Sequence, residues 1–332
     1  MKTLRNTVAA LSLLASIAAA PANAELRSIT IGTNPAGSTF FLIGGGFAKM
    51  FQEELGIRST AQPQVGSSVY LPYINNGEMT LGLSSSMDAG LAYTGEGFPA
   101  SNPNLRTLGR IWILPYAYIA ARDSGITRME DLAGKRVMGN MPTNVALTLV
   151  NKAMLESAGL TTDDVVFANS GGLLDGINAV VEGRADAAPV AVTMPDLIEA
   201  NSAAKGGIVV ITNGAKASEG FYEQLVPGTR LGVTKPVPAR PFVTEETSIV
   251  NYDTLLVTST SLSDEDAYTL TRTLHENWEQ LKKDYPPLRG VALNDLALAE
   301  STIPYHPGAV RYYQEIGLWT DQHDANQARV SR

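Results

Sequence analysis

Residues 29–56 join a strand, a turn and a helix, and this combination constrains the fold more than any other part of the sequence. Ile29-Thr30-Ile31 is a β-branched run, residues 32–38 are small or polar, and apolar residues recur at helical spacing from Thr39 to Gly56. In such a unit, the free N–H groups and the positive end of the helix dipole face the turn. Many junctions of this kind bind nothing. The stretch nevertheless predicts an α/β domain with a candidate anion site at the turn.

Two further expected strands of the first half end in the same kind of loop. Residues 59–64 lead into Gly66-Ser67-Ser68, and residues 80–83 lead into Ser84-Ser85-Ser86-Met87-Asp88. In open parallel sheets, ligands bind outside the carboxyl ends of the strands, where these loops would cluster. Ser and Gly are also ordinary turn residues, so one such loop carries no weight. Three loops in equivalent positions indicate a ligand site.

The rest of the chain predicts a second lobe and a return to the first. Strands are expected at 105–121, 137–138, 165–167, 185–192 and 208–211, and helices at 145–158, 173–182 and 195–200. This alternation predicts a mostly parallel sheet. The prolines of residues 235–244 predict an irregular return crossing. Residues 253–259 then predict a strand that pairs near residues 111–121, residues 263–283 a single helix, and the polar end past Trp319 a frayed tail.

The first 24 residues have the pattern of a secretory signal. Lys2 and Arg5 precede an apolar stretch at 8–20, and Ala22-Asn23-Ala24 is a cleavage site. We therefore expect export to the periplasm, cleavage after Ala24, and no insertion of the mature chain into the membrane. The chain contains no Cys, which excludes disulfides and zinc–thiolate sites. Its net charge of −8 argues against nucleic acid and anionic lipid as partners.

The sequence contains no recognisable catalytic or metal-binding motif. His275, His306 and His323 are scattered and form neither His-x-x-x-His nor Glu-x-x-His. A Gly-x-Ser-x-Gly elbow and a phosphate-binding loop are also absent. Gly44-Gly45-Gly46 lies inside the first expected helix, where glycine permits close packing of the helix on the sheet. We therefore expect a protein that is not an enzyme and needs no cofactor or metal.

Several motifs together carry a resemblance to a known family. They are Ile31-Gly32-Thr33, Gly37-Ser38-Thr39-Phe40-Phe41, Gly44-Gly45, Gly66-Ser67-Ser68-Val69, Asp131-Leu132-Ala133-Gly134-Lys135-Arg136-Val137, Gly183-Arg184-Ala185-Asp186-Ala187 and Pro304-Tyr305-His306-Pro307-Gly308-Ala309. From about residue 29 to 318 the chain resembles the solute-binding subunits of TRAP (tripartite ATP-independent periplasmic) transporters, the TAXI subfamily in particular. The run at 131–137 is common to many bilobed binding proteins, whereas the first and last motifs are specific to the subfamily.

The resemblance implies an α/β, bilobed periplasmic-binding-protein fold of type II, in which two hinge strands join the lobes and the ligand lies between them. The expected first lobe comprises residues 25–116 and 245–332, and the second comprises residues 117–244. Such a receptor, expected to be a monomer, captures a glutamate-like amino acid or a dicarboxylate such as 2-oxoglutarate and delivers it to a TRAP permease driven by an ion gradient. The alternatives are a protein that presents its solute to a membrane sensor and, less favoured, a hydrolase on the same fold.

The expected ligand contacts combine hydroxyls, amides and a few apolar walls. Thr33, Ser38 and Thr39 hold an anionic end of the solute, Ser67, Ser68 and Ser86 hold its middle, and Thr143, Asn144 and Thr193 close from the second lobe. Phe40 and Phe242 form apolar walls, and Arg110 or Arg240 is the candidate carboxylate clamp. Asn34-Pro35-Ala36 and Phe40-Phe41 stand where relatives have more glycine and a Tyr pair. The pocket should therefore be less polar than is usual in the subfamily.

Overall fold

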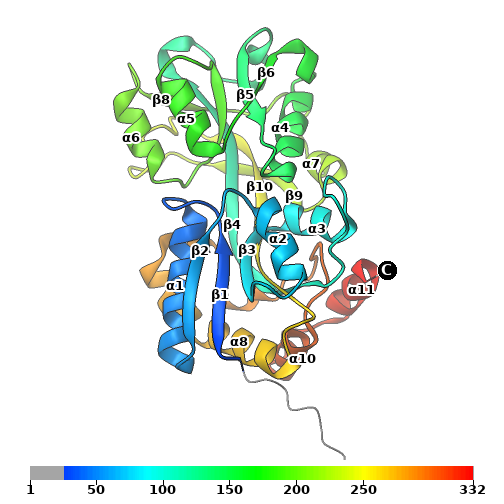
Figure 1. Cartoon of the computed structure of the whole chain (residues 1–332). Coiled ribbons are helices and arrows are strands. Elements are labelled where there is room, and N and C mark those ends of the chain that lie inside the picture. Colours follow the sequence, from blue (N-terminus) through cyan, green and yellow to red (C-terminus); the bar gives the residue numbers. More distant parts are fainter. Residues whose placement is uncertain (1–25, 332) are drawn as a thin grey trace, which may run out of the picture.

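The computed structural model describes residues 26–331 and shows two α/β lobes connected by two long strands (Figure 1). The predicted signal peptide, residues 1–24, lies outside the described residues. The sheet of the first lobe is built from β1 (Ser28–Thr33), β2 (Arg58–Pro63) and β3 (Leu81–Ser85). β1 lies in the middle and pairs in parallel with both β2 and β3.

Each of these strands leads directly into a helix. β1 is followed by α1 (Thr39–Leu55), β2 by α2 (Ser67–Asn75) and β3 by α3 (Ser86–Thr94). Because the strands are parallel and adjacent, the three helices all begin at one edge of the sheet, as the sequence predicted. A Cβ atom on Gly44 would lie 2.4 Å from Cγ2 of Thr33, which confirms that this glycine permits α1 to pack closely on β1.

Two strands, β4 (Leu105–Ala121) and β10 (Thr247–Ser259), run through both lobes. They pair with each other in antiparallel fashion, and Asp253 is opposite Ile113. This confirms the predicted pairing, although β10 begins six residues before the predicted strand. In the first lobe β10 also pairs with β3, and in the second lobe β4 pairs with β7 and β8.

The second lobe contains the middle of the chain. Its strands are β5 (Arg136–Asn140), β6 (Val166–Asn169), β7 (Ala187–Ala191), β8 (Ile208–Ile211) and β9 (Thr229–Thr234). Its helices are α4 (Val145–Ser157), α5 (Leu173–Val181), α6 (Asp196–Ala203) and α7 (Phe221–Leu225). β5 is parallel to β6 and β7, but β4 and β10 pair with β7, β8 and β9 in antiparallel fashion. The sheet is therefore mixed, and the prediction of a mostly parallel sheet is wrong for this part.

The proline-containing segment 235–244 is irregular, as predicted, but it does not cross between the lobes. It connects β9 to β10, whose register pairs Thr234 with Thr247. The backbone of the segment also reaches β8, because the N–H of Val210 donates to the carbonyl of Phe242 at 3.1 Å. The return crossing is made by β10 instead. The exact residues at which the lobes divide stay a prediction.

The C-terminal part is more helical than the sequence predicted. Its helices are α8 (Asp264–Glu276), α9 (Trp278–Asp284), α10 (Pro307–Glu315) and α11 (Asp321–Val330). The predicted helix at 263–283 is divided at Asn277, whose side-chain amide bonds to the carbonyl of Thr273 at 3.0 Å. The prediction of a frayed tail is wrong. Buried His323 and Asn326 hold α11 by bonds to the carbonyls of Ala297 (3.1 Å) and Ser301 (3.0 Å).

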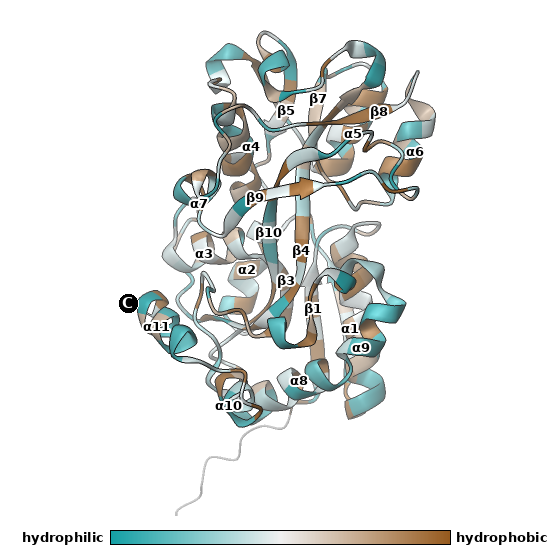
Figure 2. Cartoon of the chain, turned by 180° about the vertical axis from the view of Figure 1, so that it is seen from behind, coloured by the Kyte–Doolittle hydropathy of each residue, from teal (hydrophilic) through white to brown (hydrophobic). Residues whose placement is uncertain are grey.

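Short 3₁₀ turns connect several of these elements. They are η1 (Arg122–Ser124), η2 (Met129–Leu132), η3 (Thr162–Asp164), η4 (Pro286–Gly290) and η5 (Leu293–Leu296). Figure 2 shows apolar residues along the crossing strands and hydrophilic ones on the outer helices. Trp112, Tyr116 and Trp278 are among the largest fully buried side chains. In residues 26–331, no helix combines the length and the apolar character that crossing a bilayer requires.

Candidate functional site

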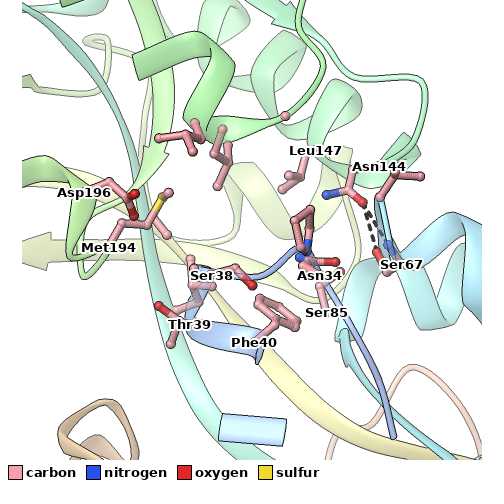
Figure 3. A pocket seen from close by; sticks show the side chains of 18 of the residues that line it. Asn34, Ser38, Thr39, Phe40, Ser67, Ser85, Asn144, Leu147, Met194 and Asp196 are labelled. Carbon is pink, nitrogen blue, oxygen red and sulfur yellow. Dashed lines mark hydrogen bonds between the residues drawn. The ribbon is translucent and has the colours of Figure 1, made fainter. Parts of the chain in front are cut away.

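A cleft with a volume of about 340 Å³ lies between the two lobes. The first lobe contributes the loop 34–38, the start of α1, and the ends of the loops that precede α2 and α3. The second lobe contributes residues 171–175 at the start of α5 and residues around the start of α6. Leu114 and Tyr252 come from the crossing strands. Both lobes therefore present the ends of strands and the first turns of helices to one space (Figure 3).

Five of the predicted ligand contacts line this cleft. They are Ser38, Thr39, Phe40, Ser67 and Asn144. Ser38 also caps α1, because its hydroxyl accepts a hydrogen bond from the N–H of Phe41 at 3.2 Å. Phe40 packs edge-on against Trp112, with 4.9 Å between the ring centroids. These residues stay predicted ligand contacts, now in a common cavity.

The remaining seven predicted contacts do not line the cleft. They are Thr33, Ser68, Ser86, Thr143, Thr193, Arg240 and Phe242. The hydroxyl of Thr33 donates to the carbonyl of Asn34 at 3.1 Å, and that of Ser86 donates to the carbonyl of Gly228 at 3.1 Å. Phe242 is only 1% exposed and belongs to the core. In these three residues the side chain contacts the protein itself.

The candidate arginine clamps also lie elsewhere. Arg110 pairs with Asp253 at 3.4 Å and with Asp295 at 3.5 Å. Arg240 donates to the hydroxyl of Thr234 at 3.2 Å, within the loop between β9 and β10. Of the residues that line the cleft in the described part of the chain, none is Lys, Arg or His. The cleft thus lacks the counter-charge that the sequence analysis expected.

The inner end of the cleft contains a dense group of hydrogen bonds around Asp88, which we call the Asp88 network. Asp88 is 2% exposed, and its carboxylate accepts from the hydroxyls of Ser67 (2.7 Å), Ser85 (2.9 Å) and Ser68 (3.4 Å). It also accepts from the backbone N–H of Ala146 at 3.3 Å, in the first turn of α4. One carboxylate of the first lobe therefore satisfies donors from both lobes.

Burial and hydrogen bonding act on Asp88 in opposite directions. Loss of water raises the pKa of Asp88, and the bonds from Ser67, Ser85, Ala146 and Ser68 offset part of this rise. The first turn of α2 supplies the hydroxyls of Ser67 and Ser68, and the first turn of α4 supplies the N–H of Ala146. These donors are already bonded to the protein's own carboxylate and are not free for an anionic solute.

Further bonds of the Asp88 network connect the lobes. The side-chain oxygen of Asn144 accepts from the backbone N–H of Ser67 at 3.0 Å, and the N–H of Val145 donates to the hydroxyl of Ser68 at 3.2 Å. Gly66 makes the approach possible, since a Cβ atom there would lie 2.2 Å from the carbonyl oxygen of Thr143. The lobes are thus in direct contact at this end.

A second set of polar residues lines another part of the cleft, and their side chains have polar atoms without hydrogen-bond partners in the described chain. We call this set the outer polar group. It consists of Asn34, Thr39, Asp196 and Tyr252. The side-chain oxygen of Asn34 is buried without a hydrogen-bond partner in the described chain. Thr39 and Tyr252 are 5% and 2% exposed, and neither hydroxyl bonds to another described residue. A buried oxygen without a partner, beside residues of a cavity wall whose polar groups also lack protein partners, indicates a place where a ligand supplies them.

Comparison with known proteins identifies the family. Residues 31–317 match the model of the NMT1-like family. The chain belongs to the NMT1-like family. Because the matched residues span most of the described chain, they include the parts of both lobes that line the cleft.

Solved structures show the same fold for this NMT1-like protein at low sequence identity. PhnD1 from Prochlorococcus marinus (MIT 9301), in complex with methylphosphonate, is 12% identical over 75% of this chain and 82% of that one, with a TM-score of 0.52. The alkanesulfonate-binding protein SsuA from Xanthomonas axonopodis pv. citri, bound to MOPS, is 15% identical over 92% of this chain and 85% of that one, with a TM-score of 0.51. The likeness confirms the predicted bilobed periplasmic-binding-protein fold of type II.

Sequence reasoning missed most of the outer polar group of this NMT1-like protein. Asp196 follows β7 and begins α6, so the strand-end rule that found Ser38 would have found it as well. Asn34 enters the sequence analysis only as part of a loop that has less glycine than in relatives, and its side chain is not predicted there to line the cleft. Tyr252 reaches the cleft from the middle of β10, and no local pattern indicates that position.

The histidines of the NMT1-like chain have structural positions. His306 caps α10 by accepting from the N–H of Gly308 at 3.2 Å, and His323 bonds at 2.8 Å to the hydroxyl of Thr320 at the start of α11. His275 bonds to the hydroxyl of Tyr312 at 3.0 Å. Within residues 26–331, no three His, Cys, Asp or Glu side chains come together as a metal site.

Proposed function

We propose that this NMT1-like protein is a periplasmic receptor that binds a small solute between its two lobes and passes it to a membrane permease, without chemical turnover. The observation that carries this proposal is the cleft of about 340 Å³, which strand ends and helix starts from both lobes line together. A cavity of this size and position is typical of small-molecule sites at domain interfaces. The type II fold supports the same reading.

The permease in this proposal is a TRAP permease. The proposal rests on the motifs at residues 31–41 and 304–309, which resemble the TAXI subfamily. A signal peptide with cleavage after Ala24 would place the receptor in the periplasm, where such a permease collects its solute.

Glutamate-like amino acids and dicarboxylates are one candidate class of solute. The first turn of α1 lies at the cleft, and Thr39 and Phe40 there offer backbone N–H groups to a carboxylate. Against this class stands the lack of a cationic side chain along the cleft in residues 26–331. A dicarboxylate would therefore rely on partial charges alone.

The experiment that tests the proposed function is native mass spectrometry of the mature protein purified from its own periplasm, followed by gentle denaturation and identification of the released molecule. We expect one small molecule bound per chain. Adding it back to ligand-free protein should raise the melting temperature, because a ligand that binds only the folded state stabilises it. Chemical conversion of the molecule by the protein would contradict the proposal, and so would the absence of any bound or stabilising metabolite.

A further inference from the structure

The charges and unpaired polar groups of the cleft indicate a narrower chemical class of solute than membership of the family does. This inference rests on the proposed function. Three carboxylates line the cleft, those of Asp88, Asp175 and Asp196. Each has a different environment. Their surroundings show which charge a solute would meet.

Two of these carboxylates accept hydrogen bonds from other groups of the protein. Asp88 accepts four hydrogen bonds in the Asp88 network. Asp175 accepts from the backbone N–H of Gly171 at 3.0 Å and from the hydroxyl of Ser170 at 3.4 Å, and so closes the first turn of α5. Asp175 is also exposed, so a cation at its free oxygen would stay hydrated and gain less than one at a half-buried carboxylate.

The third carboxylate, Asp196, is half-buried and has no hydrogen bond or ion pair with another residue in the described chain. Figure 3 shows Asp196 and Met194 of the second lobe across the cleft from Ser38 and Thr39 of the first lobe. A partly desolvated carboxylate attracts a cation more strongly than a fully hydrated one does. An ammonium group at this place would gain the charge of Asp196 and the hydroxyl of Thr39 as acceptors.

One further unpaired atom, the side-chain oxygen of Asn34, also favours a solute that donates a hydrogen bond. The side-chain oxygen of Asn34 is an acceptor only, and it is buried without a partner. Burial raises the pKa of Tyr252 well above its ordinary value, so its hydroxyl stays neutral and does not repel a cation or an anion. The acceptors therefore come from both lobes and the crossing strands.

The remaining surface of the cleft is largely apolar. It is formed mainly by Phe40, Val65, Leu147, Leu173, Leu174 and Met194. Val65 and Leu174 are 59% and 48% exposed, which is unusual for residues of their size and leaves apolar area to be covered. A solute with an aliphatic or aromatic body would bury this area and gain the corresponding hydrophobic free energy.

We infer that the cleft binds a primary amine with an apolar body, whose ammonium group lies between Asp196 and Thr39, and that it disfavours the matching carboxylate. A carboxylate at the same place would face Asp196 without a counter-charge. The donors at the starts of α2 and α4 are already bonded to Asp88.

The test uses three probes with the same six-carbon body: hexylamine, hexanamide and hexanoate. Binding to the ligand-free mature protein is titrated by ligand-observed NMR at neutral pH and low ionic strength. We expect hexylamine to bind about tenfold more tightly than hexanamide, in the range measured for a partly buried ion pair, and hexanoate to bind most weakly. Glutarate and 2-oxoglutarate serve as dicarboxylate probes and should bind no better than hexanoate.

The variant Asp196→Asn tests whether this carboxylate sets the preference. It should lower the affinity for hexylamine to that for hexanamide and leave hexanamide binding unchanged. Glu199→Gln is the matched control, because Glu199 lies one turn further along α6, is exposed and does not line the cleft. The control should keep the original order of the three probes.

The outcomes separate this inference from the proposed function. Tighter binding of hexanoate or a dicarboxylate overturns the amine preference and leaves the receptor in place. An Asp196→Asn protein that keeps its preference for hexylamine overturns the role of Asp196, and so does the failure of all three probes to bind. The proposed function fails separately, when the native protein yields no bound molecule or when the protein converts the molecule chemically.

Discussion

The two polar regions of the cleft differ in how completely their hydrogen bonds are satisfied. In the Asp88 network, one buried carboxylate accepts four bonds, and further bonds join the first lobe to Asn144 and Val145 of the second. In the outer polar group, Asn34, Thr39, Asp196 and Tyr252 have no such partners in the described chain. The difference teaches that polar residues of one cleft can serve two purposes. The hydrogen bonds of the first region join the two lobes, and the second region is the one that we propose for the solute.

The largest effect should come from Asp88→Ala. The substitution leaves three hydroxyls and the N–H of Ala146 without their acceptor in a buried place, which should lower the free energy of unfolding by about 3 kcal/mol. Urea denaturation followed by circular dichroism measures it. Asp196→Ala is the control from the outer polar group and should change the same quantity by less than about 1 kcal/mol. Equal losses in the two variants would remove the distinction between the regions.

The next largest effect should come from Thr39→Val, which removes a hydroxyl from the wall of the cleft and keeps the shape of the side chain. Because that hydroxyl has no partner within residues 26–331, the melting temperature should not fall. The affinity for the molecule recovered from the native protein should fall about tenfold, as for the loss of one buried hydrogen bond to a ligand. Isothermal titration calorimetry measures the affinity. Thr271→Val, in α8 and outside the cleft, should leave it unchanged.

A smaller effect is expected from Ser67→Ala. If Ser67 were a solute contact only, as its place among the predicted contacts implies, this change would weaken solute binding without lowering the melting temperature. The structure shows the Ser67 hydroxyl bonded to Asp88 at 2.7 Å, so its removal should lower the free energy of unfolding by about 1 kcal/mol. Differential scanning calorimetry beside a solute titration measures both quantities. A large loss of affinity with unchanged stability would restore the original interpretation.

The smallest effect is expected from pH, because the bonds to Asp88 offset part of its desolvation. The pKa of Asp88 is raised in the folded state, so the folded protein binds this proton more tightly than the unfolded chain does. The resulting contribution to the free energy of unfolding is fully present below the unfolded pKa and is lost as pH rises through the folded pKa. The Asp88→Asn protein has no carboxyl group here and lacks this pH dependence. Relative to it, the wild-type protein should therefore lose stability as pH rises from about 4, which urea midpoints across a pH series measure. An opposite slope would contradict the raised pKa.

Much of the fold and part of the site could be predicted from local patterns. The strand, turn and helix at residues 29–56 appear as β1 and α1, and the rule for parallel strand ends brought Ser38 and Ser67 to the cleft. These features depend on periodicity and turn chemistry, which are properties of neighbouring residues. The same holds for the cap that Ser263 provides to α8.

The rest depends on contacts between distant residues. Phe242 looked like a wall of the pocket, but its loop packs on β8 and its ring is buried in the core. Tyr252 reaches the cleft only because of the register between β10 and β4. The role of Ser67 was changed by Asp88, which stands 21 residues away. No spacing rule connects such pairs in advance.

The path of β10 has a consequence for the order in which the protein matures. β3 is made early, but one of its two edges is covered only when residues 254–257 arrive beside it. The ribosome has by then completed the whole second lobe, whose strands β5–β8 lie between β3 and β10 in the chain. The sheet of the portion synthesised first is therefore complete only after β10 has been synthesised. If the predicted signal peptide directs export, this delay would leave the first lobe without its complete sheet for most of synthesis, a state that suits translocation.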